Sequence, residues 1–395
     1  MTSSTTEAAR TQGPGLEAID PSRSATSAEI AQQPRVWRDL GDLLSAAGPE
    51  IDGFLRPLLA RPDLRVVLTG AGSSAFVGEL LAPALALATG HRVEAVATTT
   101  VVSGPAAVFV EDVPTLLVSF ARSGDSPESL AAVRLADAEL NEVWHLLVCC
   151  NAEGELARAF AGSDRALVLP MPAATHDRGF AMTSSFTTMV LACWFALTGT
   201  ASAPADLDRL AAAAEDLLGA APEVAALADR GPRRVVYLGS GSLTGMARES
   251  ALKLLELTAG DVLAYHESPL GFRHGPKAVL TDDNLVVVLR SSDPYTSRYD
   301  DDIVAELTGE LDPRQVVVLG AGARPSGNGS APGWSWTADG LDGLGDARVA
   351  VVLAVFAQVF ALRSSVARGL TPDNPFPSGE VNRVVQGVVV HPFPA

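Results

Sequence analysis

Cysteine is scarce in this 395-residue sequence, which contains only Cys149, Cys150 and Cys193. Three cysteines at these positions are too few for a disulfide framework, so we expect reduced, buried thiols and a cytoplasmic location. No group of cysteine and histidine residues has the spacing of metal ligands, and we therefore expect no metal site. Long apolar runs are scarce as well: the longest are interrupted well short of a membrane span, so no membrane partner is expected.

Basic residues are the second deficit. The chain has 29 lysines and arginines against 46 aspartates and glutamates, which gives a formal net charge of −17. Nucleic acids and anionic membranes are bound through basic surfaces, so this balance excludes both as general partners. An anionic small molecule would have to be held by local hydrogen-bond donors instead.

Apolar residues, by contrast, make up 47% of the sequence, enough for large cores. A chain of this length exceeds the size at which a single core stops growing, and we expect two similar domains. Residues 1–25 are rich in small polar residues and lack the patterns of targeting peptides, which predicts a disordered cytosolic tail. Residues 26–60 are predicted to form one helical segment that begins near Ser27, with Pro34 limiting or bending its first turn.

Short apolar segments alternate with helical segments after residue 60. The segments predicted to be strands are 64–69, 93–98, 114–120 and 143–150. Strands that are buried on both faces and separated by helices indicate a parallel α/β sheet. In such a sheet, ligands bind where the carboxyl end of a strand leads into the next helix.

The pattern restarts in the second half of the chain. Residues 66–73 (VVLTGAGS) match residues 235–242 (VVYLGSGS), and residues 122–125 (RSGD) match residues 290–293 (RSSD). Two matches at nearly the same offset indicate a tandem duplication of one α/β domain. The predicted parts are a first domain over 61–200, a linker helix over 201–230, a second domain over 231–370 and a C-terminal tail over 371–395 with a short strand at 388–390.

Two of the predicted strand-to-helix turns carry serine hydroxyls. Ser73 and Ser74 follow the first strand, and Ser123 and Ser126 follow the third. Hydroxyl and N–H groups at such turns suit a phosphate monoester, although serine there also serves as a simple helix cap. The glycine pair of the first turn lacks the third glycine of a dinucleotide fingerprint, and the chain has no phosphate-loop lysine, so no nucleotide cofactor is expected.

Residues 248–279 carry groups suited to proton transfer. Glu249, Lys253 and Glu256 recur at i, i+4 and i+7 on a predicted helix, so all three lie near one face, and His274 follows in a Gly-Pro loop. A carboxylate, an amine and an imidazole are the usual groups for moving protons. The alternative is a surface ion pair between Glu249 and Lys253 together with a solvated loop histidine.

Together these motifs resemble the SIS (sugar isomerase) family over nearly the whole chain from residue 26 onward. Further motifs resemble its AgaS subgroup of tagatose-6-phosphate ketose/aldose isomerases and galactosamine-6-phosphate deaminases: EIAQQP at 29–34, HDRG at 176–179, TSSF at 183–186 and SGEVNRVVQG at 378–387. The resemblance implies an α/β fold of two tandem SIS-type domains. Each would be a parallel five-stranded sheet flanked by helices, in a flavodoxin-like arrangement of three layers.

The resemblance also implies roles for residues that match the family's motifs. Glu256 would move a proton between C1 and C2 of the sugar, and His274, reaching in from a neighbouring subunit, would open the ring. Lys253 matches the family's active-site lysine, whose positive charge would stabilise an enediolate or enolamine. A shared site implies a homodimer or a dimer of dimers.

Substrate-binding positions are implied in the same way. They are Ser73, Ser74, Arg122, Ser123, Ser126, Thr183, Ser184 and Gln386, the last in a C-terminal active-site tail. The implied ligand is a hexose or hexosamine 6-phosphate, and no cofactor is implied.

The sequence departs from the pattern of glucosamine-6-phosphate synthase, a member of the same family. No glutaminase half precedes these domains, so no internal source of ammonia is expected, and Gln386 falls where the synthase has a Schiff-base lysine. We therefore expect conversion of galactosamine 6-phosphate to tagatose 6-phosphate plus ammonia, or a direct aldose–ketose isomerisation. A glucosamine-6-phosphate deaminase and a non-catalytic phosphosugar-binding regulator are the alternatives.

In the second domain, SDP at 292–294 replaces GDS at 124–126, which leaves open whether that turn binds anything.

Overall fold

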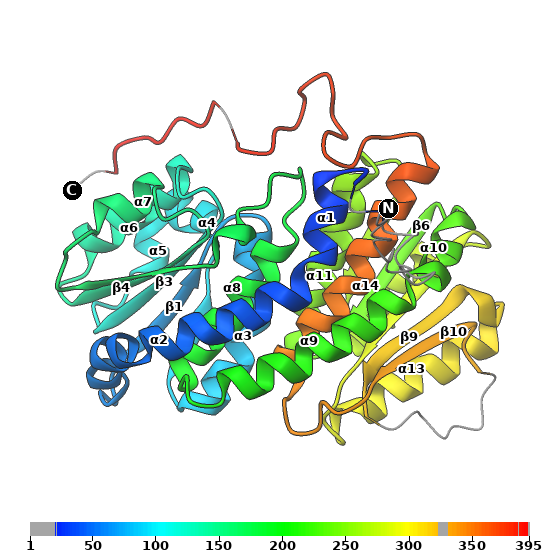
Figure 1. The fold of residues 1–395 in the computed structure, drawn as a ribbon, viewed down its shortest axis with the longest axis horizontal. Coiled ribbons are helices and arrows are strands. Elements are labelled where there is room, and N and C mark those ends of the chain that lie inside the picture. Colours follow the sequence, from blue (N-terminus) through cyan, green and yellow to red (C-terminus); the bar gives the residue numbers. More distant parts are fainter. Residues whose placement is uncertain (1–19, 21, 323–330, 386, 394–395) are drawn as a thin grey trace, which may run out of the picture.

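The computed structural model describes residues 20, 22–322, 331–385 and 387–393. These form two parallel sheets with a layer of helices between them and further helices outside (Figure 1). The predicted fold class, two tandem α/β domains with five-stranded sheets, is confirmed.

The first sheet has the strand order β2-β1-β3-β4-β5, and every neighbouring pair is parallel. Its strands are β1 (Arg65–Thr69), β2 (Arg92–Ala95), β3 (Thr115–Ala121), β4 (Val143–Cys149) and β5 (Ala166–Pro170). The connecting helices are α3 (Ser73–Thr89), α4 (Thr98–Ser103), α5 (Pro105–Val108), α6 (Pro127–Glu139), α7 (Glu155–Ala159), the 3-10 turn η2 (Ala173–Thr175) and α8 (Ser184–Thr198). The inner strands β1 and β3 are buried at every position, because helices cover both faces of the sheet.

The second sheet has the order β10-β9-β8-β6-β7, which is the same arrangement numbered from the other edge. Its strands are β6 (Arg234–Gly239), β7 (Leu263–Glu267), β8 (Asn284–Arg290), β9 (Val316–Ala321) and β10 (Trp334–Ala338). Its helical elements are α11 (Ser242–Leu257), α12 (Pro269–Phe272), η3 (Pro276–Val279), α13 (Thr296–Glu310), η4 (Pro313–Gln315) and α14 (Asp346–Ala367).

One glycine conformation recurs in both domains and supports the duplication. Gly72 precedes α3 with φ 55° and ψ −130°, and Gly241 precedes α11 with φ 55° and ψ −124°. L-amino acids with a side chain rarely adopt this backbone conformation, so glycine is needed at both turns. The two copies therefore keep the same strand-to-helix turn.

The helices outside the repeats differ from expectation in one respect. Residues 26–60 form α1 (Ala25–Ala31) and α2 (Gln33–Leu59) in place of one helix, and two helices, α9 (Ala203–Gly219) and α10 (Ala221–Asp229), occupy the region predicted as one linker helix. The break between α1 and α2 has a local cause. Pro34 has no N–H to donate to the carbonyl of Ile30, and the side chain of Gln33 donates to that carbonyl instead, at 3.1 Å.

The two domains share one apolar core. Its buried members come from both halves of the chain and include Trp37, Leu68, Phe186, Tyr237 and Phe356. Equivalent helices meet at the boundary: α3 packs on α11, and α2 packs on α9 (Figure 1). Because equivalent helices pack together in this way, the first turn of α3 lies against the side of α11.

Helix α14 is the one described helix that is long and apolar enough to cross a membrane, and here it is a core helix. Of its most apolar stretch, 89% is buried inside the protein. It packs against α8, α9, α10 and α11. No apolar run of this length was expected from the sequence. A helix that is buried on all sides is apolar around its whole circumference, which explains the run.

The C-terminal tail contains no helix or strand among its described residues, so the strand predicted at 388–390 is wrong. The tail runs across the top of the first domain (Figure 1). At its base, Asp373 accepts hydrogen bonds from the backbone N–H groups of Ala25 and Thr26 at 2.8 Å, which fixes the tail to the first turn of α1.

Candidate active site

The turn between β1 and α3 and the side of α11 together form the centre of the site. Lys253 on α11 donates a hydrogen bond of 2.9 Å from Nζ to Ser73 Oγ on α3. The close approach of the two helices depends on Gly245, because a Cβ there would lie 2.6 Å from the backbone nitrogen of Leu80. Ser74, one residue further along α3, is also buried, and its hydroxyl contacts Met182 Sδ at 3.8 Å.

Two carboxylates flank the Lys253 ammonium. Glu256 Oε2 lies 2.5 Å from Nζ, and Glu249 Oε1 lies 3.5 Å from it. Their exposure differs: the Glu249 side chain is 1% exposed, whereas that of Glu256 is 23% exposed. Of the two carboxylates, only Glu256 is therefore accessible to a substrate.

Burial sets the protonation of this cluster. It raises the pKa of Glu249 to about 7; the charge of Lys253 opposes this shift, and the charge of Glu256 adds to it. Burial opposes the charged form of Lys253 too, but the two carboxylates outweigh it, so the pKa of Lys253 lies above its usual value. Lys253 is therefore a permanent cation at neutral pH, held between a serine hydroxyl and an accessible carboxylate.

The turn between β3 and α6 carries the second predicted hydroxyl group. Ser126 caps α6, and its hydroxyl donates to Glu128 Oε2 at 2.9 Å. Ser123 Oγ accepts from the backbone N–H of Asp125 at 3.3 Å. Arg122 precedes these residues. Its charge lowers the pKa of Lys253, and the charge of Glu256 raises the pKa of Arg122. Because β1 and β3 are parallel neighbours, the two hydroxyl-lined turns that follow them lie at the same edge of the first sheet.

Thr183 and Ser184 lie in a buried network at the start of α8. Asp177 accepts hydrogen bonds from Thr183 N at 2.8 Å, Ser184 Oγ at 2.5 Å and Ser185 Oγ at 2.6 Å. Ser184 is completely buried and also accepts from the side chain of Gln32. Its hydroxyl is thus engaged within the protein, where it helps to fix the first turn of α8.

The loop that holds Asp177 is itself anchored by Glu29 on α1. One carboxylate oxygen of Glu29 accepts from Arg178 N at 2.6 Å, and the other accepts from Gly179 N at 3.2 Å. Burial, followed by the charge of Asp177, raises the pKa of Glu29 to about 7. The sequence contained both acids in short motifs but gave neither a role.

The turn of the second domain that corresponds to the β3–α6 turn is filled by a carboxylate. Asp346 at the start of α14 accepts from Ser291 Oγ at 2.5 Å, Ser292 N at 2.7 Å and Ser292 Oγ at 2.6 Å. Asp300 accepts from Ser291 N at 2.8 Å. The protein's own carboxylates therefore occupy the donors that would otherwise be free for an anion.

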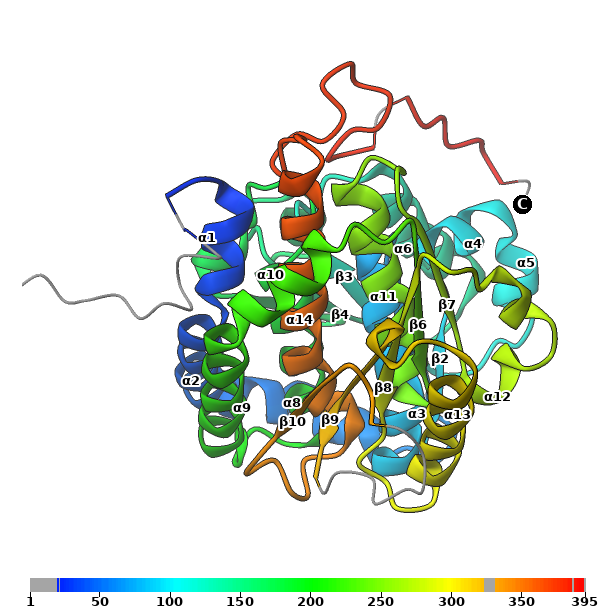
Figure 2. The same cartoon turned by 90° about the vertical axis from the view of Figure 1, so that its right-hand side faces the viewer.

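His274, the histidine predicted to open the sugar ring, is not joined to this site within the chain. His274 is exposed in the turn after α12, which lies beside α13 (Figure 2). Among the described residues, no hydrogen bond or ion pair links its side chain to Lys253, Glu256 or either serine turn. Gln386 lies outside the described residues.

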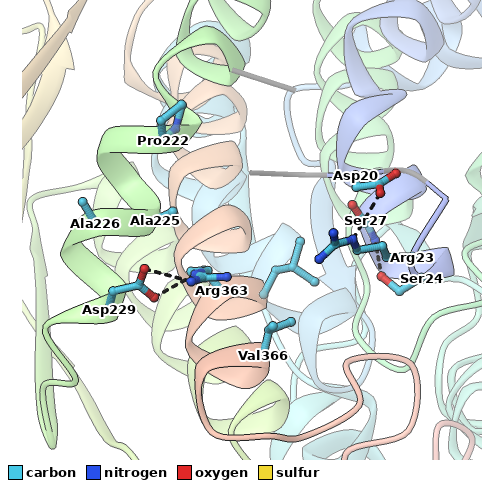
Figure 3. A pocket seen from close by; sticks show the side chains of 11 residues that line it. Asp20, Arg23, Ser24, Ser27, Pro222, Ala225, Ala226, Asp229, Arg363 and Val366 are labelled. Atoms are coloured by element: carbon cyan, nitrogen blue, oxygen red, sulfur yellow. Dashed lines mark hydrogen bonds and ion pairs between the residues drawn. The ribbon is translucent and has the colours of Figure 1, made fainter. Parts of the chain in front are cut away.

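A separate pocket opens between the segment before α1, α10 and α14 (Figure 3). Arg23, Ser27 and Arg363 are among its lining residues, and Arg363 pairs with Asp229 at 2.7 Å. None of the residues predicted for catalysis or substrate binding lines it.

Comparison with known proteins agrees with this arrangement. The SIS domain model matches residues 58–199. An AgaS protein of Streptomyces coelicolor is 56% identical over 96% of this chain and 99% of its own. The D-galactosamine-6-phosphate deaminase AgaS of Escherichia coli is 45% identical over 94% of this chain and 96% of its own. The crystal structure of tagatose-6-phosphate ketose/aldose isomerase from Escherichia coli superimposes with a TM-score of 0.84 at 42% identity, covering 95% of this chain and 98% of that one. The chain belongs to the AgaS subgroup of the SIS (sugar isomerase) family.

Proposed function

We propose that this protein is an amino-sugar 6-phosphate deaminase that converts galactosamine 6-phosphate to tagatose 6-phosphate and ammonia. The observation that carries the proposal is the contact of Lys253 with both Ser73 and Glu256, which sets an accessible carboxylate beside a hydroxyl-lined turn. The names of the Escherichia coli relatives, a deaminase in one case and a ketose/aldose isomerase in the other, support the same substrate class.

The reaction follows from the groups in the site. The sugar opens to its aldehyde, and Glu256 removes the proton from C2 to give an enolamine. Lys253 stabilises the negative charge that develops at the C1 oxygen. Return of the proton to C1 gives a ketimine, and water releases ammonia from C2 to leave the ketose. A substrate with a hydroxyl at C2 would undergo an aldose–ketose isomerisation through the same proton transfer.

The remaining parts of the proposal concern assembly and location. We propose that His274 reaches the site from a second copy of the chain and assists ring opening, because it is exposed and, among the described residues, no hydrogen bond or ion pair joins its side chain to Lys253 or Glu256. The assembly would be a homodimer or a dimer of such dimers. Three free, buried cysteines suit a reducing cytoplasm.

The test is a substrate panel. We expect ammonium release and ketose formation in equal amounts from galactosamine 6-phosphate, with slower turnover of glucosamine 6-phosphate. Faster turnover of the glucosamine epimer would identify a glucosamine-6-phosphate deaminase. Tight binding of the sugar phosphates without turnover would contradict the proposal and identify a regulator.

A further inference from the structure

The C-terminal tail brings a second arginine to the turn that carries Arg122. Arg122 Nη2 donates to the backbone carbonyl of Arg383 at 2.7 Å, and Nη1 donates to the carbonyl of Phe180 at 3.1 Å. The guanidinium of Arg383 donates in turn to the carbonyl of Asp177. Residue 383 is thus held through both its backbone and its side chain at the carboxyl end of β3.

Among the described residues, no carboxylate is in contact with either of these two positive charges. Within the described ranges, neither guanidinium forms an ion pair with a carboxylate, whereas the partly or fully buried Arg65, Arg290 and Arg348 each pair with one. Asp177 is close, but its two carboxylate oxygens accept hydrogen bonds from the first turn of α8.

Burial and the neighbouring positive charges both act on the pKa values of this group of residues. The pKa of Arg122 is lowered by burial and then by the charge of Arg383. The pKa of His176 is lowered by burial and then by the charges of Arg383 and Arg122. Among the described residues, a protein with a net charge of −17 thus keeps two guanidinium groups with no carboxylate in contact, although the more distant charges of Asp177 and Glu256 partly offset the charge of Arg122.

The chemistry of the pair fits a dianion. Each guanidinium has five N–H donors, and the contacts with backbone carbonyls use only some of them. Two guanidinium groups would balance a phosphate monoester, which carries close to two negative charges at neutral pH and accepts paired N–H donors. Ser123, the next residue after Arg122, lies in the turn whose hydroxyls suit the same group.

We propose that Arg383 and Arg122 bind the phosphate of the substrate together, so that the C-terminal tail supplies part of the phosphate site. The proposal rests on the proposed function for the identity of the substrate. It adds that phosphate binding holds the tail in place over the first domain, because the ligand lies against a side chain of the tail.

The test compares Arg383→Gln with wild type, using inorganic phosphate as the probe in calorimetric titrations. Loss of one charge-assisted contact should weaken phosphate binding about tenfold or more. The KM for galactosamine 6-phosphate should rise by a similar factor, while kcat changes little.

Arg383→Lys keeps a point charge and should retain most of the affinity. Arg178→Gln removes an exposed arginine from the neighbouring loop and is the matched control, which should bind phosphate as wild type does.

Two results would overturn the proposal. One is unchanged affinity for inorganic phosphate in Arg383→Gln. The other is an equal loss in Asp373→Asn, which loosens the base of the tail without removing a positive charge, together with no rescue by Arg383→Lys. The phosphate titration requires no turnover, so it separates this inference from the proposed function: a wild-type protein that binds phosphate through Arg383 but processes no sugar phosphate would contradict only the latter.

Discussion

Lys253 donates a hydrogen bond of 2.9 Å to Ser73, a residue 180 positions earlier in the chain and in the other copy of the duplicated domain. The same ammonium lies 2.5 Å from Glu256 Oε2. One buried cation therefore joins the hydroxyl-lined turn of the first domain to a carboxylate of the second. The site consequently depends on the packing of α3 against α11, and neither copy of the repeat contains it alone.

Replacing Lys253 with methionine should both destabilise the protein and inactivate it. The substitution leaves Glu249 buried without its partner, and removal of one member of a buried ion pair costs about 3–5 kcal/mol. Urea denaturation at pH 8 measures the loss. The double variant Glu249→Gln/Lys253→Met has no unpaired buried charge from this pair and should recover part of that stability. Wild-type stability in the single variant would contradict the assigned burial of the pair.

Glu249 should make stability depend on pH in a defined direction. Burial raises its pKa to about 7 in the folded protein, whereas an exposed glutamate titrates at about 4.3. Between these values the unfolded chain releases its proton first, so the folded state binds more protons and the contribution of Glu249 to stability falls as the pH rises. Relative to Glu249→Gln, wild type should therefore lose up to about 3 kcal/mol from pH 5 to pH 8.

Denaturation of both proteins at several pH values measures that difference. Glu29, whose pKa is also raised to about 7, is present in both proteins, so its contribution cancels. A stability difference that moves in favour of wild type as the pH rises would contradict the assignment.

Asp346 should act as an internal substitute for an anion. Asp346→Ser removes the acceptor for the hydroxyls of Ser291 and Ser292 and a carboxylate from the start of α14, which should cost about 1–3 kcal/mol. Inorganic phosphate should then raise the Tm of the variant more than that of wild type, because a second set of donors is free. Asp339→Ser, at an exposed position, is the control. Equal effects of phosphate on all three proteins would show that the second turn binds no anion.

The sequence predicted the first four strands, the repeat and the helix that carries Glu249, Lys253 and Glu256, because each depends on local spacing. The apolar runs of β1 and β3 and the i, i+4, i+7 pattern of Glu249, Lys253 and Glu256 are set by neighbours along the chain. The residue types at those spacings are therefore enough to predict whether a segment is a strand or a helix.

The supporting contacts could not be predicted, because they join distant segments. Glu29 accepts hydrogen bonds from the backbone of residues 178 and 179. The backbone carbonyl of Asp177 accepts one from the side chain of Arg383, and Asp346 accepts one from a turn 54 residues earlier. Asp177 caps α8 from six residues before Thr183, outside the positions from which a helix cap is recognised in sequence. In the sequence, the available signal was an acidic residue inside a short motif, and this signal does not identify the partner.

The proposed sharing of the site between subunits predicts complementation. Glu256→Gln and His274→Asn should each be nearly inactive alone. Mixing them under conditions that exchange subunits should restore about a quarter of wild-type activity, since half of the dimers are mixed and each mixed dimer has one intact site. No recovery, with exchange verified by mass spectrometry, would contradict the arrival of His274 from a second copy.

The most direct measurement is the turnover of galactosamine 6-phosphate by Glu256→Gln, followed by ammonium release. Glutamine keeps the shape of the side chain and removes the base, so kcat should fall by about 10²–10⁴-fold while KM changes little. Exchange of the C2 proton with solvent should be lost in parallel. A variant that releases ammonium at the wild-type rate would contradict the role of Glu256 and, with it, the account of how the two domains share one site.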